Sequence, residues 1–208
     1  MTIRLLLADD QALIRGALAA LLDLESDLDV VAQVGRGDEV VAAARESGAT
    51  VAILDIEMPG LDGIRAARAL SAEYPSCRSL IVTTFGRPGY LRRAMESGAY
   101  GFIVKDTPSA RLADAVRRVA EGLRVVDPAL AAESLACGSS PLTVRECDVL
   151  SVAATGASIS EIAHRLHLSS GTVRNYLSSA MSKTGARNRS DAVILATRQG
   201  WLDVTTDE

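Results

Sequence analysis

Five apolar runs lie in the first 105 residues, and four of them end in side chains that could do chemistry. Asp9 and Asp10 follow the first run, Asp55 follows the third, and Thr83 and Lys105 close the fourth and fifth. Carboxylates held close together repel one another and take up protons unless a cation lies among them. Three of them suit Mg²⁺, which prefers oxygen ligands and also accepts phosphate oxygens.

The same residues could carry out phosphoryl transfer. A carboxylate such as Asp55 can attack a phosphoryl group to give an aspartyl phosphate, and the reaction then depends on positioning and charge neutralisation. Mg²⁺, the Lys105 ammonium and the Thr83 hydroxyl would supply these. The competing explanation is that acidic residues often follow strands as helix N-caps. It accounts easily for one such residue but poorly for four strand ends together.

Hydrophobic periodicity predicts the elements that would position these residues. Over 1–120, short runs rich in Val, Ile and Leu alternate with helix-period segments, which is typical of a repeating βα fold. In a doubly wound sheet, ligands gather outside the carboxyl ends of the strands. We therefore expect an α/β domain with a doubly wound, five-stranded parallel sheet. The expected strands are 3–8, 29–34, 50–54, 79–83 and 101–104, and the expected helices are 12–24, 37–47, 61–73, 88–97 and 109–121.

The pattern changes beyond this domain. Periodicity weakens over 122–140, which predicts a linker with one short helix. Residues 141–202 are helical in pattern and are expected to form a small all-α domain, followed by a flexible tail at 203–208. Thr143 and Glu146 have the spacing of a capping box, which marks the start of the first helix of this domain.

A helix-turn-helix is predicted inside the second domain. Apolar stripes over 159–166 and 173–181 are separated by a short turn at 167–170. The stretch 162–190 is basic and contains no acidic residue, which suits a partner rich in phosphate. In a helix-turn-helix the second helix enters the major groove of DNA.

Outward-facing residues of that second helix are the candidates for reading DNA. Arg can pair with guanine and Asn with adenine, so Arg174 and Asn175 are the best candidates for base contacts. Thr172 and Lys183 are expected to hold phosphates. The alternative is a small helical bundle with incidental polar groups. The outward positions are Gly171, Arg174, Asn175 and Ser178.

Composition excludes several classes of protein. The 208 residues carry a formal net charge of −4. No apolar run is long enough to span a membrane, so we expect no membrane insertion. The three cysteines are odd in number and have no paired spacing, which argues against a disulfide framework and a zinc site. A cytoplasmic location fits this pattern best.

The N-terminal motifs together resemble the receiver domain of two-component response regulators. The resemblance covers 1–121 and implies a flavodoxin-like fold. The matching residues are Asp9, Asp10, the segment 55–63, Thr83 and Lys105, in the same order, spacing and strand context.

This resemblance implies a role for each residue. Asp55 would be the phosphoacceptor and a catalytic residue together with Lys105 and Thr83. Asp10, Asp55 and the backbone carbonyl of Glu57 would bind Mg²⁺, and Asp9 would support the metal. Lys105 would bridge to the acyl phosphate.

Three further positions bear on how a receiver would signal. Thr83 would be the switch residue, with its hydroxyl turning toward the phosphoryl group. Phe102 holds the aromatic position coupled to it, and because Phe has no hydroxyl, any coupling must come through packing. An ordinary core role for Phe102 is an open alternative. Phe85 stands where a polar side chain often orients water, and we hypothesise that it lengthens the lifetime of the phosphoryl group.

The C-terminal motifs look like the LuxR-type DNA-binding domain of NarL/FixJ-class response regulators, over 141–202. Two positions depart from the pattern: Ser178, where a second basic residue is common, and Thr184, where leucine is common. The segment 174–177 is similar to that of DesR-like regulators of lipid desaturation. The matching residues are Leu142, Thr143, Arg145, Glu146, Glu161, Ile162, Ala163, Leu168, Ser169, Thr172, Val173, Arg174, Lys183, Gly185, Asn188 and Arg189.

Together the two resemblances imply a transcriptional regulator of a two-component system. A cognate sensor histidine kinase would phosphorylate Asp55, which would promote dimerisation and binding to double-stranded promoter DNA, with RNA polymerase as a further partner. Beyond its own phosphotransfer and autodephosphorylation, the chain is not expected to be an enzyme. The expected contact faces between two copies are helices 12–24 and 109–121 and, in the second domain, Ala192, Val193, Leu195 and Ala196.

Three alternative functions fit the sequence less well. A phosphorylation-independent transcription factor would normally have an incomplete acidic set, which is complete here. An aspartate-nucleophile phosphatase would carry a second, spaced carboxylate on its first strand, which Asp9-Asp10-Gln11 lacks. Gly35-Arg36-Gly37 weakly suggests a dinucleotide site, but Val40 occupies the third glycine position of that motif.

Overall fold

The computed structural model describes residues 2–84, 88–128, 130–132 and 140–202. The chain divides into two compact units, one formed mainly by residues up to 132 and the other mainly by residues after it. Residues 129 and 133–139 of the linker expected after the sheet, and the whole tail expected at 203–208, lie outside the described residues. None of the described helices combines the length and the apolar character needed to cross a membrane.

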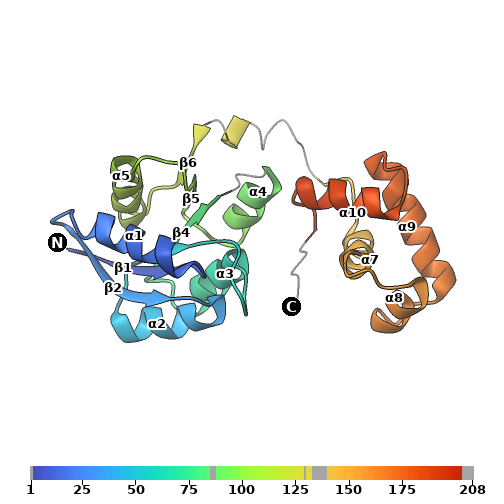
Figure 1. Ribbon diagram of the computed structural model, residues 1–208, viewed down its shortest axis with the longest axis horizontal. Coiled ribbons are helices and arrows are strands. Elements are labelled where there is room, and N and C mark those ends of the chain that lie inside the picture. Colours follow the sequence, from blue (N-terminus) through green and yellow to red (C-terminus); the bar gives the residue numbers. More distant parts are fainter. Residues whose placement is uncertain (1, 85–87, 129, 133–139, 203–208) are drawn as a thin grey trace. The chain divides into compact units, whose positions relative to one another are not determined.

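The first unit is built on one sheet with the strand order β2-β1-β3-β4-β5-β6 (Figure 1). Every neighbouring pair is parallel. The predicted doubly wound parallel sheet is therefore confirmed, and each expected strand lies within one residue of its observed bounds. The strands are β1 (Ile3–Ala8), β2 (Leu28–Val34), β3 (Val51–Leu54), β4 (Arg78–Thr83), β5 (Gly101–Val104) and β6 (Val125–Val126).

The expected count of five strands was wrong by one, because the described sheet has six. The extra strand, β6, lies inside the range expected as a linker and pairs with β5 through Gly101 and Val125. Two residues are too few to display the period-two pattern of a strand. Gly101 favours the pairing, since a Cβ atom there would lie only 3.0 Å from the carbonyl oxygen of Val125.

Helices cover both faces of the sheet, as a parallel sheet requires. Side chains of β1 alternate between the faces: Leu5 and Leu7 contact the layer of α1 and α5, and Leu6 and Ala8 contact the layer of α2, α3 and α4. The helices are α1 (Ala12–Leu22), α2 (Val40–Ser47, after the 3₁₀ turn Gly37–Glu39), α3 (Gly63–Glu73), α4 (Pro88–Glu96) and α5 (Ser109–Ala120).

The second unit is helical in its described part and encloses a core of its own. The predicted capping box is present, because Thr143 and Glu146 satisfy each other's backbone N–H groups, and Ser158 and Glu161 form a second one. Helices α8 and α9 form the predicted helix-turn-helix, and the left-handed Gly185 ends α9. The helices are α7 (Val144–Ala154), α8 (Ile159–Arg165), α9 (Ser170–Thr184) and α10 (Arg189–Arg198).

Candidate functional site

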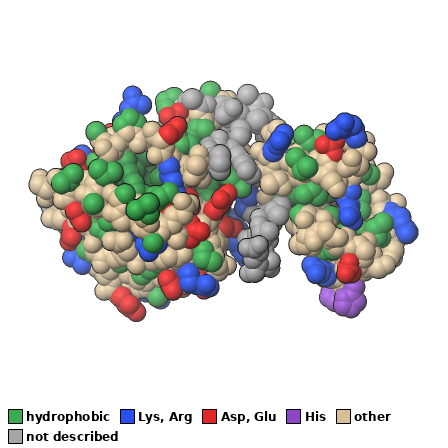
Figure 2. All heavy atoms as spheres, viewed as in Figure 1, with side chains coloured by type: hydrophobic (Ala, Val, Ile, Leu, Met, Phe, Trp, Pro, Cys, Tyr) green, Lys and Arg blue, Asp and Glu red, His purple; other side chains and the backbone are tan. Residues whose placement is uncertain are grey.

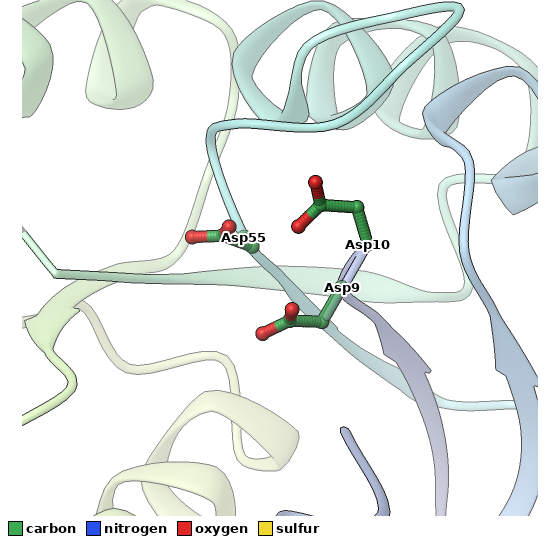
Figure 3. A group of neighbouring side chains, drawn as sticks. All are labelled: Asp9, Asp10 and Asp55. Carbon is green, nitrogen blue, oxygen red and sulfur yellow. The ribbon is translucent and has the colours of Figure 1, made fainter. Parts of the chain in front are cut away.

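The carboxylates of Asp9, Asp10 and Asp55 lie together at the carboxyl ends of β1 and β3 (Figure 3). One oxygen of each lies within 4.8 Å of the others. The two strands are neighbours with Ala8 opposite Leu54, so the residues that follow them are brought side by side. The backbone N–H of Asp55 also donates to the Ala8 carbonyl, at 2.8 Å. Asp9 and Asp55 are buried, whereas Asp10 is exposed to solvent.

Lys105 brings a positive charge to the same edge of the sheet. Its Nζ lies 2.7 Å from a carboxylate oxygen of Asp9 and 3.3 Å from one of Asp55. Thr83 is buried at the end of β4, and the backbone N–H of Lys105 donates to the Thr83 carbonyl at 2.8 Å. The side chains expected at four strand ends thus converge on one edge of the sheet.

The charges at this edge are not balanced. Burial raises the pKa of Asp55 to about 6, with a contribution from the Asp9 carboxylate, although Lys105 opposes the shift. Burial also disfavours the charge on Lys105, but hydrogen bonding to Asp9 and attraction to Asp55 outweigh it and raise the Lys105 pKa. One ammonium among three carboxylates leaves a net negative site. A divalent cation with oxygen ligands would correct this imbalance.

The loop after Asp55 depends on a glycine for its shape. A Cβ atom on Gly63 would lie 1.9 Å from the carbonyl oxygen of Asp55, so only glycine lets α3 begin this close to the site. The backbone N–H of Gly63 donates to the Ile56 carbonyl at 3.0 Å. Glu57, whose backbone carbonyl is the predicted third metal ligand, has an exposed side chain in this loop.

The remaining predicted signalling residues have different surroundings. Phe102 is completely buried in β5 and belongs to the hydrophobic core under α2, α3 and α4. That position suits an ordinary core residue, and coupling to Thr83 through packing stays a prediction. Phe85 lies outside the described residues, so the hypothesis about phosphoryl lifetime also stays a prediction.

Helix α9 presents the face that was expected to read DNA. Arg174, Asn175 and Ser178 are exposed, whereas the apolar stripe with Val173 and Leu177 is buried in the core of the second unit. Figure 2 shows Lys and Arg side chains on the visible face of this unit. The Ser169 hydroxyl caps α9 by accepting from the backbone N–H of Thr172 at 3.0 Å, and the two hydroxyls lie 2.8 Å apart.

Lys183 has a partner that the sequence did not suggest. Its Nζ lies 2.8 Å from Oε2 of Glu146, a residue only 3% exposed. The Ser179 hydroxyl donates to the same carboxylate at 2.6 Å, as does the backbone N–H of Thr143. Burial opposes the charge on Glu146, but these donors outweigh it and lower its pKa to about 2. The spacing of the capping box pointed to Glu146, but no pattern links it to a lysine 37 residues away.

Known proteins resemble both units of the chain. Residues 5–117 match the response regulator receiver domain, and residues 140–196 match the bacterial regulatory proteins of the luxR family. The transcriptional regulatory protein DesR of Bacillus subtilis is 42% identical over 200 residues, which are 96% of this chain and 99% of DesR. The response regulator RamR of Streptomyces coelicolor is 43% identical over 202 residues, covering 96% and 98%. The crystal structure of response regulator ChrA, from a heme-sensing two-component system, has a TM-score of 0.59 at 34% identity and covers 95% and 98% of the two chains.

Proposed function

Because the chain belongs to the response regulators that carry a receiver domain and a LuxR-type DNA-binding domain, we propose that phosphorylation of Asp55 activates this transcriptional regulator. The observation that carries the proposal is the approach of the Asp9, Asp10 and Asp55 carboxylates to within 4.8 Å of one another. Lys105 within ion-pair distance of two of them supplies the fixed cation that phosphoryl transfer needs.

The donor set of this cluster fits Mg²⁺. All donors are hard oxygens, and the raised pKa of the buried Asp55 supports a site in which Lys105 alone does not balance the carboxylates. Asp10, Asp55 and the backbone carbonyl of Glu57 would hold the ion, and Asp9 would support it. When bound, Mg²⁺ neutralises negative charge on the oxygens of the transferred phosphoryl group.

The side chains of this chain would perform the transfer as follows. A carboxylate oxygen of Asp55 attacks the phosphorus of a phosphohistidine on the sensor kinase. The new bond from oxygen to phosphorus forms as the bond from nitrogen to phosphorus breaks, and the leaving imidazole takes up a proton. Lys105 pairs with the new negative charge, and the Thr83 hydroxyl turns toward it as the switch. We propose no catalysis beyond this transfer and the hydrolysis of its product.

Helix α9 would read the promoter. Arg174 and Asn175 are exposed and have the chemistry for guanine and adenine, and Thr172 and Ser178 lie beside them. The ion pair of Lys183 with Glu146 leaves this lysine less available for a phosphate than the sequence alone suggests. Arg174 therefore bears most of the specific contact in this proposal.

A second copy of the chain is the partner that activation would recruit. One DNA-binding domain makes few phosphate contacts, and two on adjacent half-sites multiply them. Leu13 and Leu24, in and just after α1, are 87% and 81% exposed, and Leu123, just after α5, is also exposed. Apolar side chains exposed to this extent are available for burial against a second copy. They support a dimer formed through the receiver, with RNA polymerase as a later partner on the promoter.

Intact-mass spectrometry after incubation with acetyl phosphate and Mg²⁺ tests the phosphorylation step. We expect a mass increase of one phosphoryl group in the native chain and none in Asp55→Asn. Asp114→Asn, a change of the same kind at an exposed position of α5, should behave as the native chain. A native chain that gains no phosphoryl group under these conditions would sink the proposal.

Gel filtration and DNA binding with beryllofluoride, which mimics the phosphoryl group, test the switch. The treated native chain should dimerise and bind promoter DNA more tightly, and Asp55→Ala should do neither. Equal behaviour of the two proteins would favour a phosphorylation-independent transcription factor.

A further inference from the structure

Arg15 lies beside the acidic cluster and takes no part in the mechanism above. It extends from α1, and its guanidinium donates a hydrogen bond to the backbone carbonyl of Asp9. Together with Asp9, Asp55 and Lys105 it lines a small cavity at the base of the site. Arg15 is half-buried.

The segment around Asp9 is held at several polar groups. The backbone N–H of Asp9 donates to the Val34 carbonyl at 3.2 Å, and that of Gln11 donates to the Asp9 carboxylate at 2.8 Å. The guanidinium of Arg15 adds a hold on the Asp9 carbonyl. That carbonyl belongs to the planar peptide joining Asp9 to Asp10, so fixing it fixes the direction from which the Asp10 side chain begins.

The guanidinium also lies near the chain that follows β2, where Gly35 has no side chain. A Cβ atom on Gly35 would lie 3.6 Å from Nη1 of Arg15, which is ordinary contact distance. Arg15 therefore spans from α1 across the end of β1 to the chain that follows β2. The hydrogen bond to the Asp9 carbonyl is the contact through which Arg15 supports this loop.

We propose that Arg15 is a positioning residue of the metal site: it orients the peptide between Asp9 and Asp10 so that Asp10 can bind a divalent cation together with Asp55. The inference rests on the proposed function. Its second consequence is electrostatic, because a fixed positive charge close to the carboxylates disfavours a second cation. The two effects of removing Arg15 therefore have opposite signs, and an affinity measurement tells which is larger.

The test is to titrate the full chain with Mn²⁺ in the absence of any phosphoryl donor. Electron paramagnetic resonance measures how tightly the ion binds. In Arg15→Met we expect Mn²⁺ to bind at least about tenfold more weakly, the size seen when an outer-shell partner of a metal ligand is lost. Arg68→Met, which removes the same charge from an exposed position of α3, should bind as the native chain does. Equal or tighter binding by Arg15→Met would overturn the positioning role.

A second variant guards against a loss of folding. Arg15→Gln removes the charge but keeps a polar side chain with an N–H donor, and its fold can be checked by circular dichroism. If Arg15 is a positioning residue, Arg15→Gln should bind Mn²⁺ more weakly than the native chain, because the shorter neutral donor holds the Asp9 carbonyl less well. If the role of Arg15 is purely electrostatic, Arg15→Gln should bind Mn²⁺ more tightly. If Arg15→Gln bound Mn²⁺ with the same affinity as the native chain, the inference would also be overturned. If the native chain bound no Mn²⁺, or if Asp10→Asn bound it equally well, the proposed metal site itself would fall, which is a different result.

Discussion

Asp55 in the first unit and Glu146 in the second are both buried carboxylates within ion-pair distance of a lysine, but their pKa values are shifted in opposite directions. Burial raises the pKa of Asp55 to about 6, and Lys105 does not offset it. Burial acts on Glu146 in the same direction, but hydrogen bonds from Lys183 and Ser179 outweigh it and lower the pKa to about 2. The donors around Glu146 therefore balance its negative charge, whereas those around Asp55 do not.

This difference separates a structural pair from a binding site. Lys105 and Lys183 are the only lysines in the sequence, and each pairs with a buried carboxylate. Glu146 shares its lysine with no other acid within the network described above, whereas Asp55 shares Lys105 with Asp9. A fold that gathers acids around too few cations is poised to bind one. The charge deficit at Asp55 therefore supports the cation site proposed for the acidic cluster.

The largest expected effect is the loss of stability when the Glu146 carboxylate is removed. Glu146→Ala removes the partner of Lys183 and one half of a capping box, and we expect it to destabilise the second unit by about 3 kcal/mol. Unfolding can be followed by the fluorescence of Trp201, the single tryptophan, which packs against the core of this unit. Glu161→Ala is the matched control, because Glu161 completes the other capping box from an exposed position. An equal cost in both variants would mean that the pair with Lys183 adds nothing.

The same carboxylate fixes how this stability depends on pH. The folded pKa of Glu146, about 2, lies below its ordinary value of 4.5. Its contribution is therefore present above pH 4.5 and is lost as the pH falls toward 2. In Glu146→Ala this part of the acid transition should disappear.

The second effect has the opposite sign. The folded pKa of Asp55, about 6, lies above its ordinary value of 3.8, so the folded state binds more protons between these two values. Without metal, stability then falls as the pH rises through this window. We expect Asp55→Asn to stabilise the first unit by about 2 kcal/mol at neutral pH and not at all below pH 3.8. Hydrogen exchange in the presence of EDTA, read segment by segment, would measure it, and a gain that persisted in acid would contradict the assignment.

Much of this architecture could be predicted because parallel strands leave few choices. Once the apolar runs are identified as neighbouring parallel strands, the residues that end them must converge, which placed Asp9, Asp55, Thr83 and Lys105 correctly. β6 was not predicted, because two residues are too few to show the alternating pattern of a strand. The pair of Glu146 and Lys183 escaped because it depends on how α7 and α9 pack, and Arg15 escaped because it acts on a backbone carbonyl, which has no residue type to recognise.

The third effect is selective stabilisation by metal. At Mg²⁺ concentrations ten times its dissociation constant, binding should stabilise the first unit by about 1.4 kcal/mol. The Trp201 transition of the second unit should not move, since Glu146 already has its cation. Asp10→Asn should abolish the gain. Stabilisation of both units alike, seen by hydrogen exchange, would show that Mg²⁺ acts on the chain in general rather than at the acidic cluster.

The smallest effect decides what Lys183 does. Its side chain is 35% exposed, so part of its interaction with Glu146 is screened by water, and we expect Lys183→Gln to cost about 1 kcal/mol of stability in the second unit. A phosphate contact would instead appear in the salt dependence of DNA binding, whose slope would fall by about one when the contact is lost. We expect that slope to be unchanged in Lys183→Gln and the affinity to fall in Arg174→Gln, which should leave stability unchanged because Arg174 is exposed. A reduced slope with no loss of stability in Lys183→Gln would reverse the comparison, because Lys183 would then serve DNA rather than the fold.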